Sequence, residues 1–183
     1  GYIKNFYKAF DSLGCVTSHI NFFKRTIKLD EHIQKQDIIF VGGGNTKSML
    51  AVWKEWGLDK ILFDAYNNEV IMSGVSAGAI CWFKKGITDS WQDHQAILPC
   101  LNFVDGVCCP HYDEEAERKP SLLKFINENL LSDCYAIDGG CAVHIKNDEL
   151  YKAISFKNGK NTYLVRKENG KVNEVPLPRI NIS

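Results

Sequence analysis

Two apolar runs in this chain have glycine at or next to their ends and pass straight into a helical pattern, and this repeat constrains the fold more than any other feature. The first run, DIIFVGGG, covers 37–44 and precedes the pattern NTKSMLAVWKEWG. The second run, EVIMSGV, covers 69–75 and precedes SAGAICWFKK. Strands that alternate with helices form right-handed βαβ units, so the sequence predicts an α/β fold with a mainly parallel sheet and helices on both faces.

Further segments continue this alternation. VDGVCCPHY (104–112) and CYAID (134–138) are typical of buried strands, and a helix is expected between them, with Pro120 in its first turn. Before the first strand, apolar residues recur at helical spacing over 3–13 and predict an amphipathic helix.

The pattern changes after 139–140. The tail shows alternating residues punctuated by the turn signals KND, KNGK and ENGK. Asn-Gly and Asn-Asp favour tight hairpin turns. The tail is therefore predicted to be a C-terminal antiparallel β meander that finishes or extends the sheet within the same domain.

The composition excludes several classes of function. The 183 residues suffice for one domain with a sizeable core, and Lys plus Arg equal Asp plus Glu at 22 each, with no dense run of one sign. Such a chain is not expected to bind nucleic acid or an anionic membrane surface. No apolar run is long enough to span a bilayer, and no signal peptide is recognisable.

The cysteines indicate a reducing environment. There are seven, an odd number, and none forms a CxxC pair. Several lie inside apolar runs, where cysteine behaves as a small apolar residue. We therefore expect reduced thiols in a cytoplasmic protein rather than a disulfide framework.

The segment GVSAG places Ser76 between Gly74 and Gly78, at the predicted junction of a strand and a helix. This Gly-x-Ser-x-Gly pattern forms the sharp turn that exposes a nucleophilic serine in many acyl-transfer enzymes. At a helix N-terminus the amide of Ala77 is able to donate to an oxyanion. The five residues alone fit equally well a tight turn of small residues that packs a helix on a sheet.

A second candidate is the glycine run 42–44, which is followed by Asn45 and Thr46. It ends a predicted strand, so its backbone amides reach the same sheet edge as Ser76 and are a candidate second oxyanion donor. The run has neither the ending of a P-loop nor the spacing of a dinucleotide site. A glycine-rich connection without a ligand is the alternative.

Of the five histidines, His111 is the best placed to act as a base, because it ends a predicted strand and precedes a polar loop. His94, in the loop after Ser76, is its competitor. A carboxylate would fix the tautomer of the imidazole, and the residues leave the candidates unranked, namely Asp89, Asp93, Asp113, Glu114 and Asp138. A metal site of Cys109, His94 and His111 lacks zinc-like spacing, so no metal or organic cofactor is expected.

Four motifs together carry a resemblance to a known family. FVGGGNT, GVSAGAICWF, ITDS and CCPHYD, in this order and spacing, resemble peptidase family S51. This family includes aspartyl dipeptidases of the peptidase E type and, more distantly, cyanophycinases. The similar stretch covers roughly 37–145, well over half of the chain, and the joint match is far more specific than GVSAG alone.

The resemblance implies a Ser-His-Asp triad. Ser76 falls on the nucleophile of the family, His111 on its base and Asp89 on the acid in the segment between them. Asp138, in AIDGG, is the fallback acid.

The resemblance also implies the groups that bind the substrate. The oxyanion hole would consist of the backbone amides of Gly44 and Ala77. Arg118 is the position that matches the arginine by which aspartyl dipeptidases hold an acidic side chain, and Asn45 is expected to contact the substrate as well.

The fold implied is that of class I glutamine amidotransferases, a three-layer, flavodoxin-like architecture. Ser76, Asp89 and His111 fall within 36 residues in this order, as such a fold allows, with Ser in place of the amidotransferase Cys. Family members carry a strand-helix-strand unit before the first helix. Residues 1–183 are therefore expected to form a single domain that lacks this unit.

The activity implied is that of a serine exopeptidase that hydrolyses short peptides. A dipeptidase with a preference for N-terminal Asp is the leading specificity, in a monomer or homodimer. Two alternatives stay open: another acyl hydrolase, such as an esterase or an isopeptidase, and a non-catalytic binding protein on the same fold.

Overall fold

The computed structural model describes residues 1–182, and the chain divides into two compact units, Gly1–His32 and Ile33–Ser183. The first unit begins with α1 (Tyr2–Asp11), which confirms the helix predicted from apolar spacing. A second helix, α2 (Leu29–Gln34), spans the sequence boundary between the units. Among the residues described, every helix is too short or too polar to cross a membrane. All candidate site residues lie in the second unit.

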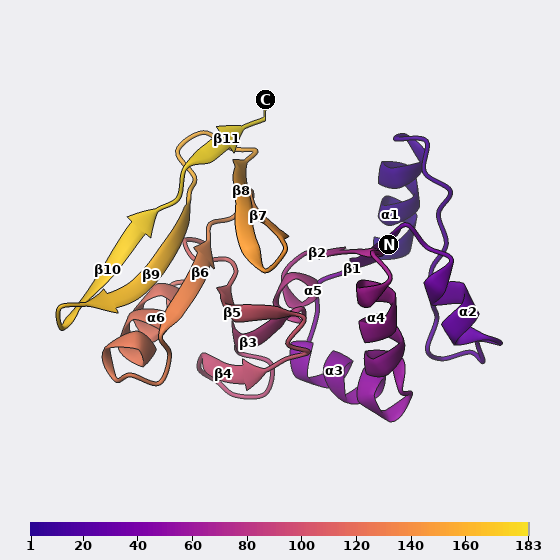
Figure 1. The fold of residues 1–183 in the computed structure, drawn as a ribbon, viewed down its shortest axis with the longest axis horizontal. Helices are drawn as coiled ribbons and strands as arrows, with labels where there is room; N and C mark the ends of the chain where they lie inside the picture. The colour runs from indigo at the N-terminus through magenta and orange to yellow at the C-terminus, as the bar shows by residue number, and fades with distance from the viewer. Residues whose placement is uncertain (183) are drawn as a thin grey trace. The chain divides into compact units, whose positions relative to one another are not determined.

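A parallel strand pair lies beneath the turn that contains Ser76. β1 (Ile38–Val41) and β2 (Ile71–Gly74) form this pair, and α3 (Thr46–Glu55) and α4 (Leu58–Asn67) connect them (Figure 1). The strand-helix-strand order predicted for this region is thus confirmed. The helix α4 is not among the predicted elements.

The start and end of α3 follow from two residues that the sequence singles out. Asn45 caps the helix, because its side-chain oxygen accepts a hydrogen bond from the amide of Ser48 at 2.9 Å. Gly57, with a φ of 66°, turns the chain from α3 into α4. This left-handed conformation favours glycine because a Cβ would clash with the backbone. The cap fixes the point at which the preceding glycine run ends and the helix begins.

The helix predicted from SAGAICWFKK is much shorter than expected. α5 covers only Ala77–Ile80, and the chain then enters β3 (Phe83–Thr88) and β4 (Ala96–Pro99). Gly86 gives the physical reason, since a Cβ at this position would lie 1.6 Å from Cγ2 of Ile80. The glycine lets β3 pass close to α5, and pairing with β4 and β5 holds the chain from Phe83 onward as a strand.

A mixed six-stranded sheet forms the centre of the second unit (Figure 1). Besides β3 and β4 it contains β5 (Val104–Cys109), β6 (Asp133–Ile137), β9 (Thr162–Glu168) and β10 (Lys171–Pro176), in the order β10-β9-β6-β5-β3-β4. Only β3, β5 and β6 pair in parallel, and the outer pairs are antiparallel. The α/β class is therefore confirmed. The mainly parallel, flavodoxin-like layering is not confirmed.

The C-terminal tail divides between two sheets. β7 (Cys141–Lys146) and β8 (Glu149–Ser155) form a hairpin, and β11 (Arg179–Asn181) adds to it, while β9 and β10 form a hairpin at the edge of the larger sheet (Figure 1). Positive φ values at Asn147 and Asn169 match the predicted turns. The hairpins are thus confirmed, but a single meander is not.

The helix α6 (Arg118–Asn127) covers part of the large sheet and contacts β9 and β10. Its buried residues Leu122 and Ile126 join Ile87 of β3 and Val165 of β9 in one apolar cluster. This helix confirms the prediction made around Pro120. Because the start of α6 is held by the core, the segment that joins β5 to α6 is held at the end of the sheet.

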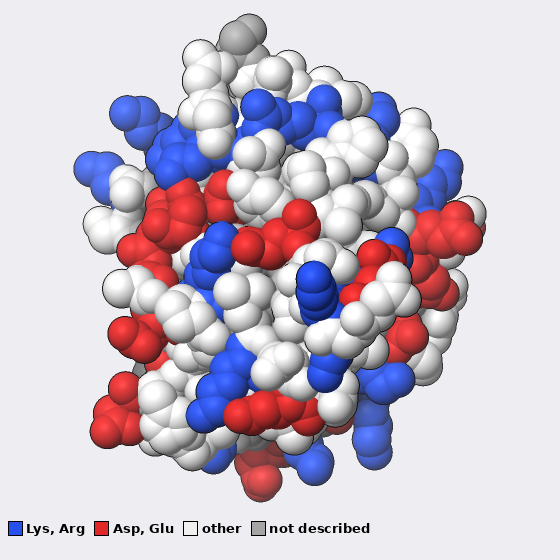
Figure 2. Space-filling view, turned by 90° about the vertical axis from the view of Figure 1, so that its left-hand side faces the viewer, with Lys and Arg blue, Asp and Glu red and all other residues white. Residues whose placement is uncertain are grey.

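The surface and the cysteines agree with the expectations from composition. Figure 2 shows positive and negative side chains interspersed on one face, with no continuous area of a single sign. Four cysteines are buried, which agrees with core thiols, and burial raises the pKa of each thiol; they are Cys81, Cys108, Cys109 and Cys134. Cys15 is exposed, unlike the core thiols expected.

Candidate active site

Ser76 occupies a strained turn between β2 and α5. Its φ of 56° and ψ of −118° lie in a region that residues with a side chain rarely adopt. The flanking glycines are required by close backbone contacts. A Cβ on Gly74 would lie 2.3 Å from the carbonyl oxygen of Gly78, and a Cβ on Gly78 would lie 2.0 Å from that of Val41. The geometry therefore has the features of a nucleophile turn, and packing alone accounts for its glycines.

A substitution at Gly78 tests this packing. We expect Gly78→Ala to lower the free energy of unfolding by about 1–3 kcal/mol, because the new methyl group must displace backbone rather than a flexible side chain. Urea denaturation followed by circular dichroism measures the change. An unchanged midpoint would contradict the close contact between α5 and β1.

The glycine run lies directly beside the candidate nucleophile. A Cβ on Gly43 would be 3.3 Å from the Cβ of Ser76 and 3.8 Å from its Oγ. Gly44 has a φ of 149°, a conformation open to glycine. Within residues 1–182, neither the amide of Gly44 nor that of Ala77 has an acceptor. Both amides predicted for the oxyanion hole thus lack a hydrogen-bond acceptor within these residues.

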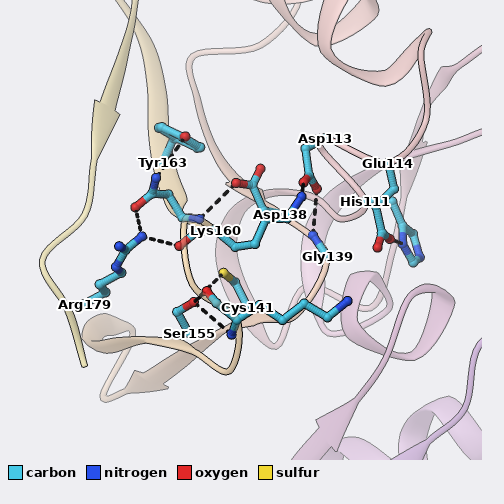
Figure 3. Close-up of polar contacts among 12 residues, drawn as sticks. His111, Asp113, Glu114, Asp138, Gly139, Cys141, Ser155, Lys160, Tyr163 and Arg179 are labelled. Atoms are coloured by element: carbon cyan, nitrogen blue, oxygen red, sulfur yellow. Dashed lines mark hydrogen bonds and ion pairs between the residues drawn. The ribbon is translucent and has the colours of Figure 1, made fainter. Parts of the chain in front are cut away.

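His111 follows β5 and is held by a carboxylate three residues further along the chain. Its Nδ1 lies 2.8 Å from Oε2 of Glu114, with the imidazole 29% exposed (Figure 3). Gly139 makes room for this contact, since a Cβ there would lie 1.9 Å from Oε1 of Glu114. The carboxylate that contacts the imidazole is therefore Glu114 and not Asp89, the residue favoured by the resemblance.

Three parallel strands bring the other acid candidates to the same edge of the sheet. Gly86 of β3 lies opposite Cys108 of β5, and Cys108 lies opposite Tyr135 of β6. Asp89, His111 and Asp138 each come three residues after one of these paired positions in the sequence. The edge therefore gathers Asp89 and Asp138 on the two sides of the histidine segment.

Asp138 and Asp113 form a separate polar cluster next to Glu114 (Figure 3). Asp138 is 6% exposed and accepts a hydrogen bond from the amide of Asn161 at 2.9 Å, and burial raises the pKa of its carboxyl. Asp113 accepts from the amide of Gly139 at 2.8 Å and pairs with Lys160. Both carboxylates have structural partners, and neither has a hydrogen bond to His111 within the described part of the chain.

The predicted substrate contact Asn45 is engaged at both ends of its side chain. Its oxygen accepts from Ser48, and its nitrogen donates to the carbonyl of Ser90. The amide of Thr46 donates to Oγ of Ser90 at 3.0 Å. These bonds tie the end of the glycine run to the loop after β3. They give Asn45 a structural role, and its contact with the substrate stays a prediction.

Arg118 is likewise placed differently from its prediction. Its side chain is 4% exposed, and Nε and Nη2 both donate to Oε2 of Glu115. Nη1 donates to the carbonyl of Ile87 at 2.7 Å. A buried guanidinium with these partners is not available to an acidic substrate side chain. The predicted role of Arg118 is thus corrected to that of a buried link between α6 and β3.

The competing base and the metal alternative lie outside this arrangement. His94 is exposed and bonded to its neighbour Asp93 at 2.9 Å. Cys109 is completely buried, and burial raises the pKa of its thiol to about 12. Among residues 1–182, no group of three potential ligands has a metal-binding arrangement.

The second unit therefore contains a glycine-flanked serine beside the glycine run and a histidine held by a carboxylate. In the part of the chain that is described, neither Oγ of Ser76 nor Nε2 of His111 has a hydrogen-bond partner, so the two atoms are not joined here. An arrangement with these groups is suited to acyl transfer.

The chain is similar to proteins that are named as peptidases. The chain is 44% identical over 178 residues to "Uncharacterized peptidase YgaJ" of Bacillus subtilis, covering 97% of this chain and 77% of the relative. It is 31% identical over 127 residues to "Peptidase E" of Haemophilus influenzae, covering 63% of this chain and 53% of the relative.

A solved structure supports the fold. It is a 1.5 Å crystal structure from Listeria monocytogenes EGD-e whose description includes the name peptidase E, with a TM-score of 0.64 and 22% identity over 82% of this chain and 75% of that one. Finally, residues 1–153 match Peptidase family S51. With most of its length matched, the chain belongs to peptidase family S51.

Proposed function

We propose that this protein is a serine-type exopeptidase that hydrolyses short peptides. The observation that carries the proposal is the turn at Ser76, whose backbone is strained and which lies directly beside Gly43 of the glycine run. Because the chain belongs to peptidase family S51, we expect this turn to serve peptide hydrolysis. Packing explains the glycines on either side, but it does not require a serine whose hydroxyl lacks a hydrogen bond within residues 1–182.

The proposed reaction begins with attack of Ser76 Oγ on the carbonyl carbon of the scissile bond. Nε2 of His111 takes the hydroxyl proton, and the amides of Gly44 and Ala77 donate to the developing oxyanion. When the tetrahedral intermediate collapses, the imidazolium gives its proton to the leaving amine and an acyl-enzyme remains. Water then attacks the ester, with His111 again as the base, and the serine is released.

Glu114 completes this mechanism as the carboxylate that orients the base. An acceptor at Nδ1 keeps the neutral imidazole protonated on that nitrogen, which leaves the lone pair of Nε2 free for the serine proton. The same carboxylate stabilises the imidazolium that forms during attack. Its distance of 2.8 Å from Nδ1 supports Glu114 over the alternatives, Asp89 and Asp138.

The preference for N-terminal Asp loses its main support. The family resemblance implied that specificity, with Arg118 as the residue that would hold the acidic side chain, and Arg118 is buried against Glu115. The proposal therefore covers short peptides without an acidic first residue as a requirement.

Two sets of substrates test the proposal. We expect the purified protein to release amino acids from unblocked dipeptides, with Ala-X at least as good as Asp-X, and to hydrolyse p-nitrophenyl esters through the same serine. Hydrolysis of esters alone would favour the general acyl hydrolase. No hydrolysis of either set by folded protein would favour a non-catalytic binding protein.

A further inference from the structure

The turn that follows β6 packs directly against the carboxylate that holds His111. A Cβ on Gly139 would lie 1.9 Å from Oε1 of Glu114 and 2.1 Å from its Cδ, so the backbone of the turn touches this carboxylate (Figure 3). The second oxygen of the carboxylate, Oε2, lies 2.8 Å from Nδ1 of His111. The position of Gly139 therefore limits where Glu114 can lie when it contacts the imidazole.

The segment after β5 is joined to this turn at two points. Oδ1 of Asp113 accepts a hydrogen bond from the amide of Gly139 at 2.8 Å. One residue earlier, the amide of Tyr112 donates to the carbonyl of Ile137 at 3.0 Å. Because Glu114 directly follows Asp113 in the chain, a movement of the turn would change the position of the carboxylate beside the imidazole.

Lys160, in the connection between β8 and β9, binds the other oxygen of Asp113. Its Nζ donates to Oδ2 of this carboxylate and forms an ion pair with it. The hydrogen bond to Asp113 raises the pKa of the Lys160 ammonium, and the charges of Asp138 and Glu114 raise it further. Asp113 is therefore bonded to the turn at one oxygen and to the lysine at the other.

The backbone on either side of this lysine is held in place. Asp138 and Asn161 are joined by two hydrogen bonds, one from each backbone amide, at 2.9 and 3.1 Å. Nη1 of Arg179, in β11, donates to the carbonyl of Lys160 and to Oδ1 of Asn161 (Figure 3). The ammonium of Lys160 thus extends from a fixed backbone, which makes it suitable for holding another group in place.

We propose that Lys160 is a positioning residue for the catalytic base. The inference rests on the proposed function and deepens it. Lys160 fixes the carboxylate of Asp113, which in turn fixes the backbone at Gly139. That backbone forms the wall against which Glu114 contacts the imidazole of His111. A displacement of about 1 Å at a catalytic group is enough to lower a rate by up to about a hundredfold, whereas a partly exposed ion pair contributes little to stability.

Replacement of Lys160 by methionine tests the inference. We expect Lys160→Met to lower kcat for an Ala-X dipeptide by about tenfold and to leave KM within about twofold, because the lysine acts through the base and not on the substrate. Lys160→Arg retains a charged donor for Asp113 and should keep at least about half of the wild-type kcat. The control is Lys157→Met in the same connection, since Lys157 is exposed and forms no ion pair within residues 1–182. Its kcat should equal that of the wild type.

The imidazole provides a readout that a purely structural lysine would not change. Long-range proton–nitrogen NMR correlations of His111, identified by their loss in His111→Gln, report which ring nitrogen carries the proton. We expect the Nδ1-protonated form in the wild type and in Lys160→Arg, and a mixture of both tautomers in Lys160→Met. The urea unfolding midpoints of these variants should stay close to that of the wild type.

A second variant keeps the inference testable if Lys160→Met fails to fold. Asp113→Asn should lower kcat by a similar factor, and where both variants fold their combination should be no slower than the slower single variant, because the two residues act in one chain of contacts. Additive losses would overturn the positioning role. So would an active wild type whose Lys160→Met variant keeps its kcat and its tautomer, or changes KM alone. Wild-type protein that neither hydrolyses dipeptides nor reacts with a fluorophosphonate would reject the proposed function, and the NMR comparison would still decide whether Lys160 acts on His111.

Discussion

Replacement of Ser76 by alanine is expected to abolish peptide hydrolysis, with kcat lowered by at least about a thousandfold. The serine provides the only proposed nucleophile, so without it the oxyanion donors can assist only the attack of water. Alanine is smaller than serine, and the serine hydroxyl has no hydrogen bond among the residues described. The variant should therefore fold, and its unfolding midpoint should stay close to that of the wild type.

Release of amino acids from an Ala-X dipeptide measures the effect. Ser132→Ala is the matched control, because this exposed serine follows α6 in the chain and lies at none of the site positions. It should keep wild-type activity. A Ser76→Ala protein that still turns over at a rate within tenfold of the wild type would show that the turn is a packing element only.

The second large effect is expected from Glu114. Replacing it with glutamine should lower kcat by about a hundredfold to ten-thousandfold, as wrong orientation or tautomer of the imidazole does in related triads. The side chain keeps its size, so the space next to Gly139 stays filled. The loss should appear in kcat more than in KM, since Glu114 contacts the base rather than the substrate.

A control from the same region separates charge from position. Glu117 is exposed and precedes α6, and Glu117→Gln removes an equal charge a few residues from His111. Its kcat should match that of the wild type. If Glu114→Gln retains full activity while Asp89→Asn loses it, the carboxylate assigned by the resemblance is the acid after all.

Much of the fold follows from local sequence. β1, β2, β5, β6 and α6 form where apolar runs, caps and turn residues predict them, because each is specified by signals within about ten residues. β3 is missed since FKKGIT is short and has two lysines, so it shows no apolar periodicity. Its position depends on a long-range contact between Gly86 and Ile80.

The positions of Ser76 and His111 at strand ends were predictable from sequence, but the carboxylate that contacts His111 was not. Ser76 and His111 stand in motifs that specify a strand end, and the structure places both at such ends. The carboxylate that contacts His111 depends on two features that no motif reports: the positive φ of His111, 53°, and the space beside Gly139. Glu114 was one of five unranked candidates for this reason.

Arg118 shows the same limit for substrate recognition. From sequence alone, an arginine after the histidine segment could be an exposed cation that binds substrate or a buried residue that joins α6 to β3. The choice depends on Glu115 and on the carbonyl of Ile87, which is 31 residues away in sequence. Long-range polar pairs of this kind have no local signature, so specificity is harder to read from sequence than the nucleophile.

The most direct test of the central claim is to locate the covalent adduct formed by a fluorophosphonate probe. Tryptic mass spectrometry of the labelled protein should find the phosphonyl group on the peptide that contains Ser76, with labelling lost in Ser76→Ala and strongly slowed in His111→Gln. An adduct on any other residue, or equal labelling of the wild type and Ser76→Ala, would contradict the assignment of Ser76 as the nucleophile.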